Sequence, residues 1–266
     1  AVTGSSYDNL RGKINVKKTS YKNQDKRYTF EDFAILSSFD KEERTIAVNS
    51  PDIINGQVQG KFKIEEIIKL AENSLGSIYA NYKPHEISDG QYLNFNFKIY
   101  NQIATIFDKN LNLAQNTIIK GRIETDEKGF ELEFLSPKIS FKDYIATNVN
   151  LEVDNNNPVY NTYLEVKKLD SDIYNVSDFS LINATKRDTL FIKSEFKGGV
   201  DNADDYDMNL FYTIAEENKS VIGFRKSELK FKGFDWFVNS GKDNFNKITF
   251  DRNFDNFIID DIRVNQ

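Results

Sequence analysis

The sequence contains no cysteine, and only four prolines, one histidine and one tryptophan among its 266 residues. Without cysteine, disulfides, thiolate metal sites and a cysteine nucleophile are excluded. Proline is expected to be scarce in a chain that is mostly strand, because it cannot donate to the hydrogen-bond ladder of a sheet. The single histidine, His85, has no partner residues at motif spacing, so we expect a surface or turn residue and not a triad or metal ligand.

The sequence also lacks a long apolar run and a strong charge of one sign. No stretch approaches the roughly 18 apolar residues that a membrane-spanning helix needs. The net charge is −6, and basic residues are scattered among acidic ones, which argues against a nucleic-acid groove. The chain begins "AVTGSSYD" without a methionine, which predicts an excised fragment or a processed product.

What the sequence has in abundance is alternation of apolar and polar residues. In "QYLNFNFKIY" (91–100), large apolar side chains share one parity and Asn94, Asn96 and Lys98 lie between them. Alternate side chains of a strand point to opposite faces, so the apolar groups lie together. Similar segments recur along most of the chain and are separated by turn-forming stretches such as "DEKG" and "DNNNP". The pattern predicts an all-β fold of roughly 14 to 16 strands, mostly antiparallel.

One segment has helical periodicity instead. Residues 63–82 are expected to form an amphipathic helix, which Pro84 helps to end. Its apolar residues would dock on the sheet, and we hypothesise that they plug or gate an apolar interior: Ile64, Ile67, Ile68, Ala71, Leu75 and Ile78. The alternative is that the helix simply packs on the sheet. No linker divides the chain, so residues 1–266 are expected to form one unit, with residues 1–55 as a separable edge.

Candidates for chemistry are weak. The acidic stretch with Asp201, Asp204, Asp205 and Asp207 does not have EF-hand spacing, so we expect a solvated loop. Trp236 could stack on a sugar, but a half-buried strand aromatic is the simpler interpretation. We therefore predict no catalytic residue, no metal site and no cofactor.

The apolar side chains that share one face of the strands must be covered. A dozen exposed Phe, Leu and Ile side chains would forgo roughly 20–35 kcal/mol of burial, more than a typical domain stability of about 5–15 kcal/mol. A second sheet could cover them, as in a β-sandwich, or the sheet could curl into a trough that holds an apolar guest. Alternation alone does not choose between the two.

Several long stretches resemble a known family. They are "LAENSLGSIYANYKPHEISDGQYLNFNFKIYN" (70–101), "FSLINATKRDTLFIKSEFKGG" (179–199), "SELKFKGFDWFVN" (227–239) and "ITFDRNFDNF" (248–257). In this order they are similar to segments of the TamB proteins, the translocation and assembly module of the gram-negative envelope, within the AsmA-like superfamily. The resemblance covers most of the chain and would make it an interior piece.

The resemblance implies a fold and a function. TamB-like proteins are similar to the bridge-like lipid-transfer proteins, whose long curled sheet, a β-taco or repeating β-groove, has an apolar interior. It implies a periplasmic segment of an inner-membrane-anchored protein that supports phospholipid transport and, with an Omp85-type barrel partner, outer-membrane protein assembly and protein secretion. No catalytic residues carry over from the family, and the piece lacks the anchor and the region that would meet the barrel.

Together, the alternation and the resemblance predict a groove lined by apolar side chains that contact phospholipid acyl chains. The expected lining residues are Leu93, Phe95, Phe97, Ile99, Phe130, Leu132, Phe134, Val149, Leu151 and Val153. Two alternatives stay open: a chaperone that pairs an edge strand with outer-membrane barrel strands, and a secreted carbohydrate-binding β-sandwich.

Overall fold

The structure is a computed structural model that describes residues 2–22, 27–76, 83–100, 104–106, 108–125, 129–186, 189–215, 219–239, 246–251, 255–260 and 262–266. Almost all of this chain is β-strand. The first strands are β1 (Val2–Thr3), β2 (Arg11–Val16), β3 (Thr19–Lys22), β4 (Arg27–Phe30), β5 (Phe33–Asp40), β6 (Glu43–Asn49) and β7 (Ile54–Lys61). The middle strands are β8 (Tyr92–Ile99), β9 (Leu111–Leu113), β10 (Thr117–Glu124), β11 (Phe130–Phe141), β12 (Tyr144–Asp154), β13 (Thr162–Asp170) and β14 (Val176–Lys186). The last are β15 (Thr189–Gly198), β16 (Asp204–Ile214), β17 (Ser220–Phe224), β18 (Ser227–Phe231), β19 (Phe234–Val238), β20 (Lys247–Phe250), β21 (Phe257–Asp260) and β22 (Val264–Asn265).

Twenty of these strands form one antiparallel sheet, and β3 and β4 form a separate two-stranded sheet. From β2 to β16 each strand pairs with the next along the sheet, in the order β2, β5, β6, β7, β8, β10, β11, β12, β13, β14, β15, β16. β9 lies beside the second half of β11. Beyond β16 the sheet divides, because β17 and β18 pair with different halves of the same strand.

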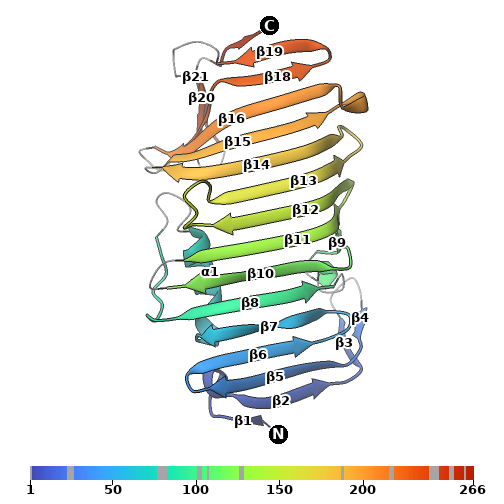
Figure 1. The fold of residues 1–266 in the computed structure, drawn as a ribbon, viewed down its shortest axis with the longest axis vertical. Helices are drawn as coiled ribbons and strands as arrows, with labels where there is room; N and C mark the ends of the chain where they lie inside the picture. Colours follow the sequence, from blue (N-terminus) through green and yellow to red (C-terminus); the bar gives the residue numbers. More distant parts are fainter. Residues whose placement is uncertain are drawn as a thin grey trace.

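The predicted all-β, antiparallel fold is confirmed, but the curled shape is not. Figure 1 shows a long ladder of strands with the two termini at opposite ends, and the sheet is not strongly curled. The described residues contain no second large sheet facing the first, so the sandwich has no support. The first 55 residues join the sheet through β2, β5, β6 and the start of β7.

The predicted helix is present within the described residues. It begins as a 3-10 turn, η2 (Ile64–Glu66), and continues as α1 (Ile67–Gly76). Residues 77–82, which include Ile78, lie outside the described residues. Two further 3-10 turns are η1 (Tyr7–Asn9) and η3 (Val200–Asn202). No helix in the described part of the chain is both long and apolar enough to cross a membrane.

The register of the sheet separates an apolar face from a polar one. Leu93 pairs with Ile123, and one strand further Leu132 pairs with Val153. The same parity continues through Leu164 and Leu181 on β13 and β14. Asn, Lys, Arg and Glu side chains occupy the opposite parity on the central strands. We call these two surfaces the apolar face and the polar face. α1 packs on the apolar face, where its Leu70 belongs to the same buried cluster as Leu93 and Val153.

Candidate functional site

All ten predicted lining residues lie on the apolar face. The register aligns Phe95, Leu132 and Val153 in one row across the strands, and Phe97, Phe134 and Leu151 in the next. Leu93 and Phe130 belong to the row at one end of these strands, whereas Ile99 and Val149 lie toward the other end. The register therefore shows that the ten side chains share one face of the sheet, and their role as the lining of a groove stays a prediction.

Burial of these residues depends on where they lie along the strands. Those beneath α1 are buried: Leu93, Ile123, Phe130 and Val153. Near the opposite strand ends Thr117, Ser136 and Val149 are buried, whereas Ile99 is half-buried. Those between the two rows are only half-buried, and we call them the central strip: Phe95, Phe97, Ile119, Leu132, Phe134 and Leu151. The central strip crosses β8, β10, β11 and β12, so it runs along the length of the sheet and not along its strands.

Aromatic rings in the central strip lie against glycines of the neighbouring strands. A Cβ added to Gly121 would come within 2.7 Å of the ring of Phe95, and one added to Gly56 within 2.8 Å of the ring of Phe97. Because each glycine leaves room beside it, the ring lies over the backbone of the next strand.

The helix covers one margin of this face through a narrow stripe. Ile64, Ile67 and Ala71 pack against the core beside the fully buried Leu70. The prediction that Ile68 and Leu75 dock with them is wrong, because these side chains are 71% and 43% exposed. Leu70 lies three residues after Ile67, so helical spacing could have identified it. The stripe that contacts the sheet therefore runs through Ile64, Ile67, Leu70 and Ala71, and Ile68 and Leu75 lie outside it.

Polar contacts hold the helix start in place. The carboxylate of Glu66 accepts hydrogen bonds from the Ser88 backbone N–H at 2.8 Å, from Gln91 Nε2 at 2.7 Å and from Ser88 Oγ at 3.1 Å. These bonds, with the backbone N–H of Ser88 foremost, lower the pKa of Glu66 to about 2. Gln91 Oε1 in turn accepts from the Lys63 backbone N–H at 2.8 Å, and Asp8 Oδ1 accepts from the Ile64 backbone N–H at 2.8 Å. We call this group of Asp8, Glu66, Ser88 and Gln91 the polar clamp; no sequence motif signals it.

His85 lies at the side of the helix, where it contacts Glu72 and Asn73. Its Nε2 is 2.9 Å from Glu72 Oε2, and its backbone N–H donates to Asn73 Oδ1 at 2.7 Å. The segment that follows the helix is thus tied back to it. Among the described residues no group of histidines and acids is arranged to hold a metal ion.

The prediction of a solvated acidic loop is wrong in part, because Asp204, Asp205 and Asp207 belong to strand β16, whereas Trp236 is the half-buried strand aromatic that the sequence predicts. Asp204 is buried and accepts from Tyr174 OH at 2.7 Å and from the Lys232 backbone N–H at 2.8 Å, and these bonds lower its pKa. Asp205 and Asp207 point to the polar face of β16. Trp236 pairs with Leu229 on the apolar face and is half-buried, with no hydrogen-bond partner for its Nε1.

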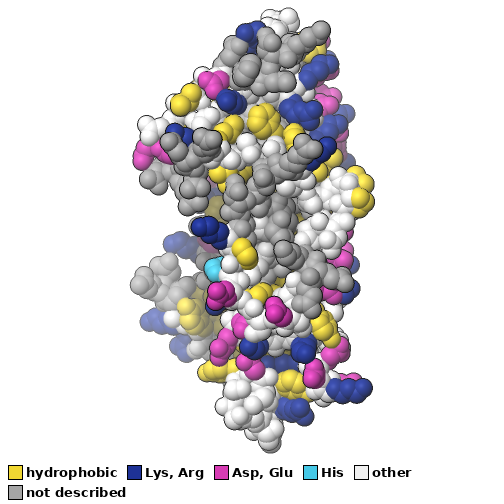
Figure 2. All heavy atoms as spheres, turned by 90° about the vertical axis from the view of Figure 1, so that its left-hand side faces the viewer, with side chains coloured by type: hydrophobic (Ala, Val, Ile, Leu, Met, Phe, Trp, Pro, Cys, Tyr) yellow, Lys and Arg dark blue, Asp and Glu magenta, His cyan; other side chains and the backbone are white. Residues whose placement is uncertain are grey.

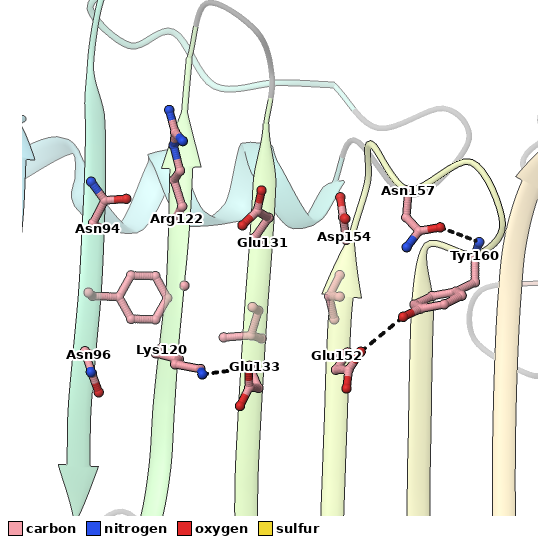
Figure 3. Close-up of a pocket in the computed structure, with 14 residues that line it drawn as sticks. Asn94, Asn96, Lys120, Arg122, Glu131, Glu133, Glu152, Asp154, Asn157 and Tyr160 are labelled. Carbon is pink, nitrogen blue, oxygen red and sulfur yellow. Dashed lines mark hydrogen bonds and ion pairs between the residues drawn. The ribbon is translucent and has the colours of Figure 1, made fainter.

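A shallow depression of about 660 Å³ lies on the polar face, behind the candidate surface. Figure 3 views it with α1 running across the strands behind them. Two of its carboxylates have partners within the depression: Lys120 Nζ lies 2.8 Å from Glu133 Oε2, and Tyr160 OH donates to Glu152 Oε2 at 3.1 Å. Asn94, Asn96 and Arg122 complete this polar surface, and Arg122 forms an ion pair with Glu124. Figure 2 shows that Lys and Arg side chains and Asp and Glu side chains both occur at the side of the molecule that faces the viewer.

Comparison with known proteins identifies no relative: no family model, no curated protein and no solved structure matches the chain.

Proposed function

We propose that the chain is a non-catalytic segment of a lipid-transport protein, and that its apolar face carries phospholipid acyl chains. The observation that carries this proposal is the half-buried central strip on a sheet of one layer. The molecule exposes 17106 Å², whereas a compact monomer of its 30.8 kDa mass would expose about 11,900 Å². The apolar face accounts for part of this excess and is available to a guest.

The energetics favour an apolar guest over water on the central strip. Full burial of a large apolar side chain is worth about 1.5–3 kcal/mol, so a half-buried one forgoes roughly 1 kcal/mol. A guest also gains about 0.8 kcal/mol for each methylene group that it buries. Both partners therefore gain when an acyl chain lies along the strip, and no directional bond fixes its position.

The direction of the strip suits transport. Because its rows cross successive strands, a chain that lies on it can pass from β8 to β12 and onward over Leu164 and Leu181 without leaving apolar surface. Movement would be passive sliding, with headgroups kept in water at the open side. We further propose that α1 limits access to this surface from one margin, as a gate.

The cellular setting extends the proposal. On the resemblance to TamB and AsmA-like proteins, the chain would belong to the periplasmic part of an inner-membrane-anchored protein that moves phospholipid toward the outer membrane. An Omp85-type barrel would be contacted by regions beyond these residues, in support of outer-membrane protein assembly.

Trp236 provides a direct test, because it is the only tryptophan and lies on the apolar face. The protein is titrated with phospholipid vesicles or short-chain lipids that carry brominated acyl chains, which quench a tryptophan in contact with them. We expect quenching, and we expect native mass spectrometry of gently purified protein to detect bound lipid. Absence of both would refute the proposal.

A matched pair of variants locates the surface. Phe134 and Leu135 are adjacent, both half-buried, and lie on opposite faces of β11. Phe134→Asp should weaken lipid binding at least about fivefold, since loss of one buried aromatic contact exceeds 1 kcal/mol. Leu135→Asp should leave lipid binding unchanged; equal losses in the two variants would show that the apolar face is not the binding surface.

Leu70, which anchors α1 in the core, allows a test of whether the helix acts as a gate. Leu70→Glu places a charge in the buried core beneath α1, whereas Ile68→Glu places one on the exposed side of the same helix. We expect Leu70→Glu to displace the helix and increase the initial rate of Trp236 quenching, with Ile68→Glu as the control. An unchanged rate in Leu70→Glu, with the helix shown to be displaced by hydrogen exchange, would contradict gating but leave lipid binding intact.

A further inference from the structure

The last strand of one branch of the sheet, β21, lies at the edge of the described sheet and has an unusual composition. It pairs with β20 on one side, and no other described strand pairs with its outer side. Phe257, Ile258 and Ile259 are 58%, 54% and 65% exposed. None of the other described edge strands has three consecutive exposed apolar residues.

These side chains are distributed over both faces of the sheet. The register pairs Phe257 with Phe250 and Ile259 with Ile248, so both lie on the apolar face, and Ile258 points to the other face. Soluble proteins usually protect such edges with charges, bulges or a covering element, because free backbone N–H and C=O groups are a template for another strand. Here the strand itself carries no charge before Asp260.

We propose that β21 is a self-association site, at which β21 of a second copy of this chain pairs antiparallel with it about a two-fold axis. In the matching register Ile258 lies opposite its own copy, and Phe257 lies opposite Ile259 of the partner subunit. Apolar groups then meet on both faces, and cross-strand pairs of this kind stabilise a sheet. A two-fold axis perpendicular to the sheet also keeps the two apolar faces on the same side.

Pairing of β21 with β21 of a second copy is more favourable than pairing of β21 with β2, the strand near the opposite end of the sheet. The free part of β2 carries Ile14 on the apolar face, but Lys13 and Asn15 on the other. Ile258 would then meet a polar side chain. Such head-to-tail pairing would bring Asp260 to the basic β2 edge, so added salt would screen the attraction and weaken the association. Pairing of two acidic β21 ends brings like charges together, so added salt would strengthen the association or leave it constant.

The absence of cysteine allows a clean cross-linking test. Ile258→Cys should give a disulfide-linked dimer on mild oxidation, because the two-fold register places each residue 258 opposite the other. The matched control is Leu36→Cys, since Leu36 is 45% exposed but lies on the inner strand β5. Equal cross-linking of the two variants at the same concentration overturns the proposal.

Sedimentation supplies the second measurement. We expect the unmodified chain to dimerise reversibly, and Ile258→Lys to weaken that association at least about tenfold, because two like charges would lie directly opposite each other. Leu36→Lys should leave it unchanged. A chain that stays monomeric at high concentration, or an association that salt weakens and Ile258→Lys does not, refutes the two-fold interface.

Discussion

The polar clamp leads to a prediction about Glu66, whose carboxylate accepts three hydrogen bonds from Ser88 and Gln91. Glu66→Gln removes the negative charge but keeps the shape of the side chain. The backbone N–H of Ser88 and Gln91 Nε2 would then donate to a neutral amide and no longer to a carboxylate. Hydrogen bonds to charged groups are roughly twice as strong as neutral ones, so the clamp should loosen.

The size of the effect follows from the pKa of Glu66, which falls from its ordinary value of 4.5 to about 2. A shift of this size corresponds at most to about 3.4 kcal/mol at neutral pH. The side chain is 19% exposed, and solvent screening reduces such energies, so we expect a loss of about 1–2 kcal/mol. Because the helix can open without the sheet, the loss should appear as local opening.

Hydrogen exchange is the suitable assay. At pH 7 the protection of residues 64–76 should fall roughly 5- to 30-fold in Glu66→Gln, while protection of β14 stays constant. Glu65→Gln is the control, because Glu65 is exposed on the same turn. Equal effects of the two substitutions would refute the assignment of the clamp to Glu66.

The pH dependence gives a second check on the same residue. The pKa of Glu66 is lower in the folded protein than in the unfolded chain, so its stabilising contribution is fully present above about pH 5 and is lost as pH falls toward 2. The difference in protection between the natural chain and Glu66→Gln should therefore shrink to about two fifths of its neutral value, in free energy, at pH 3. A difference that stays constant over this range would show that charge is not the cause.

Two further predictions concern the sheet. Gly121→Val should destabilise the protein by about 1–3 kcal/mol in urea denaturation, because its Cβ would lie 2.2 Å from the Glu131 carbonyl oxygen as well as against Phe95; Gly129→Ala, whose nearest contacts are 3.4 Å away, should cost less than Gly121→Val. Tyr174→Phe should cost about 1–2 kcal/mol because it removes a hydrogen bond to the buried Asp204, and Tyr144→Phe, on an exposed tyrosine, should be neutral. If Gly129→Ala cost as much stability as Gly121→Val, or Tyr144→Phe as much as Tyr174→Phe, the contacts of Gly121 or Tyr174 would not explain the loss.

Alternation predicted the fold class and the shared face of the candidate residues because strand periodicity is local. Phe95 and Phe97 must share a side whichever strands flank them. Alternation did not reveal which positions along a strand are covered, because this depends on where α1 packs on the sheet. Leu93 and Phe95 have the same parity and similar chemistry, yet only Leu93 is buried beneath the helix.

The helix face and the polar clamp were harder to predict for a related reason. Ile68 and Leu75 satisfy helical spacing, and so does Leu70, so the sequence offers overlapping stripes. Tertiary bonds choose among them: Asp8 holds the backbone of Ile64, and Glu66 holds Ser88, which fixes the rotation of the first turn. Partners that are 22 and 56 residues apart in the chain leave no local signal.

The helix is held by apolar packing and by hydrogen bonds, and the share of each affects how it could act as a gate. A cover held only by apolar packing would compete with any acyl chain for the same surface. Here the apolar contact is confined to a narrow stripe through Ile64, Ile67 and Leu70, and much of the positioning comes from hydrogen bonds at the rim. Bonds at the rim can break one at a time, and the sheet beneath does not depend on them because its own ladder is complete from β2 to β16. A helix mounted in this way can shift over the margin of the apolar face while the central strip keeps its shape.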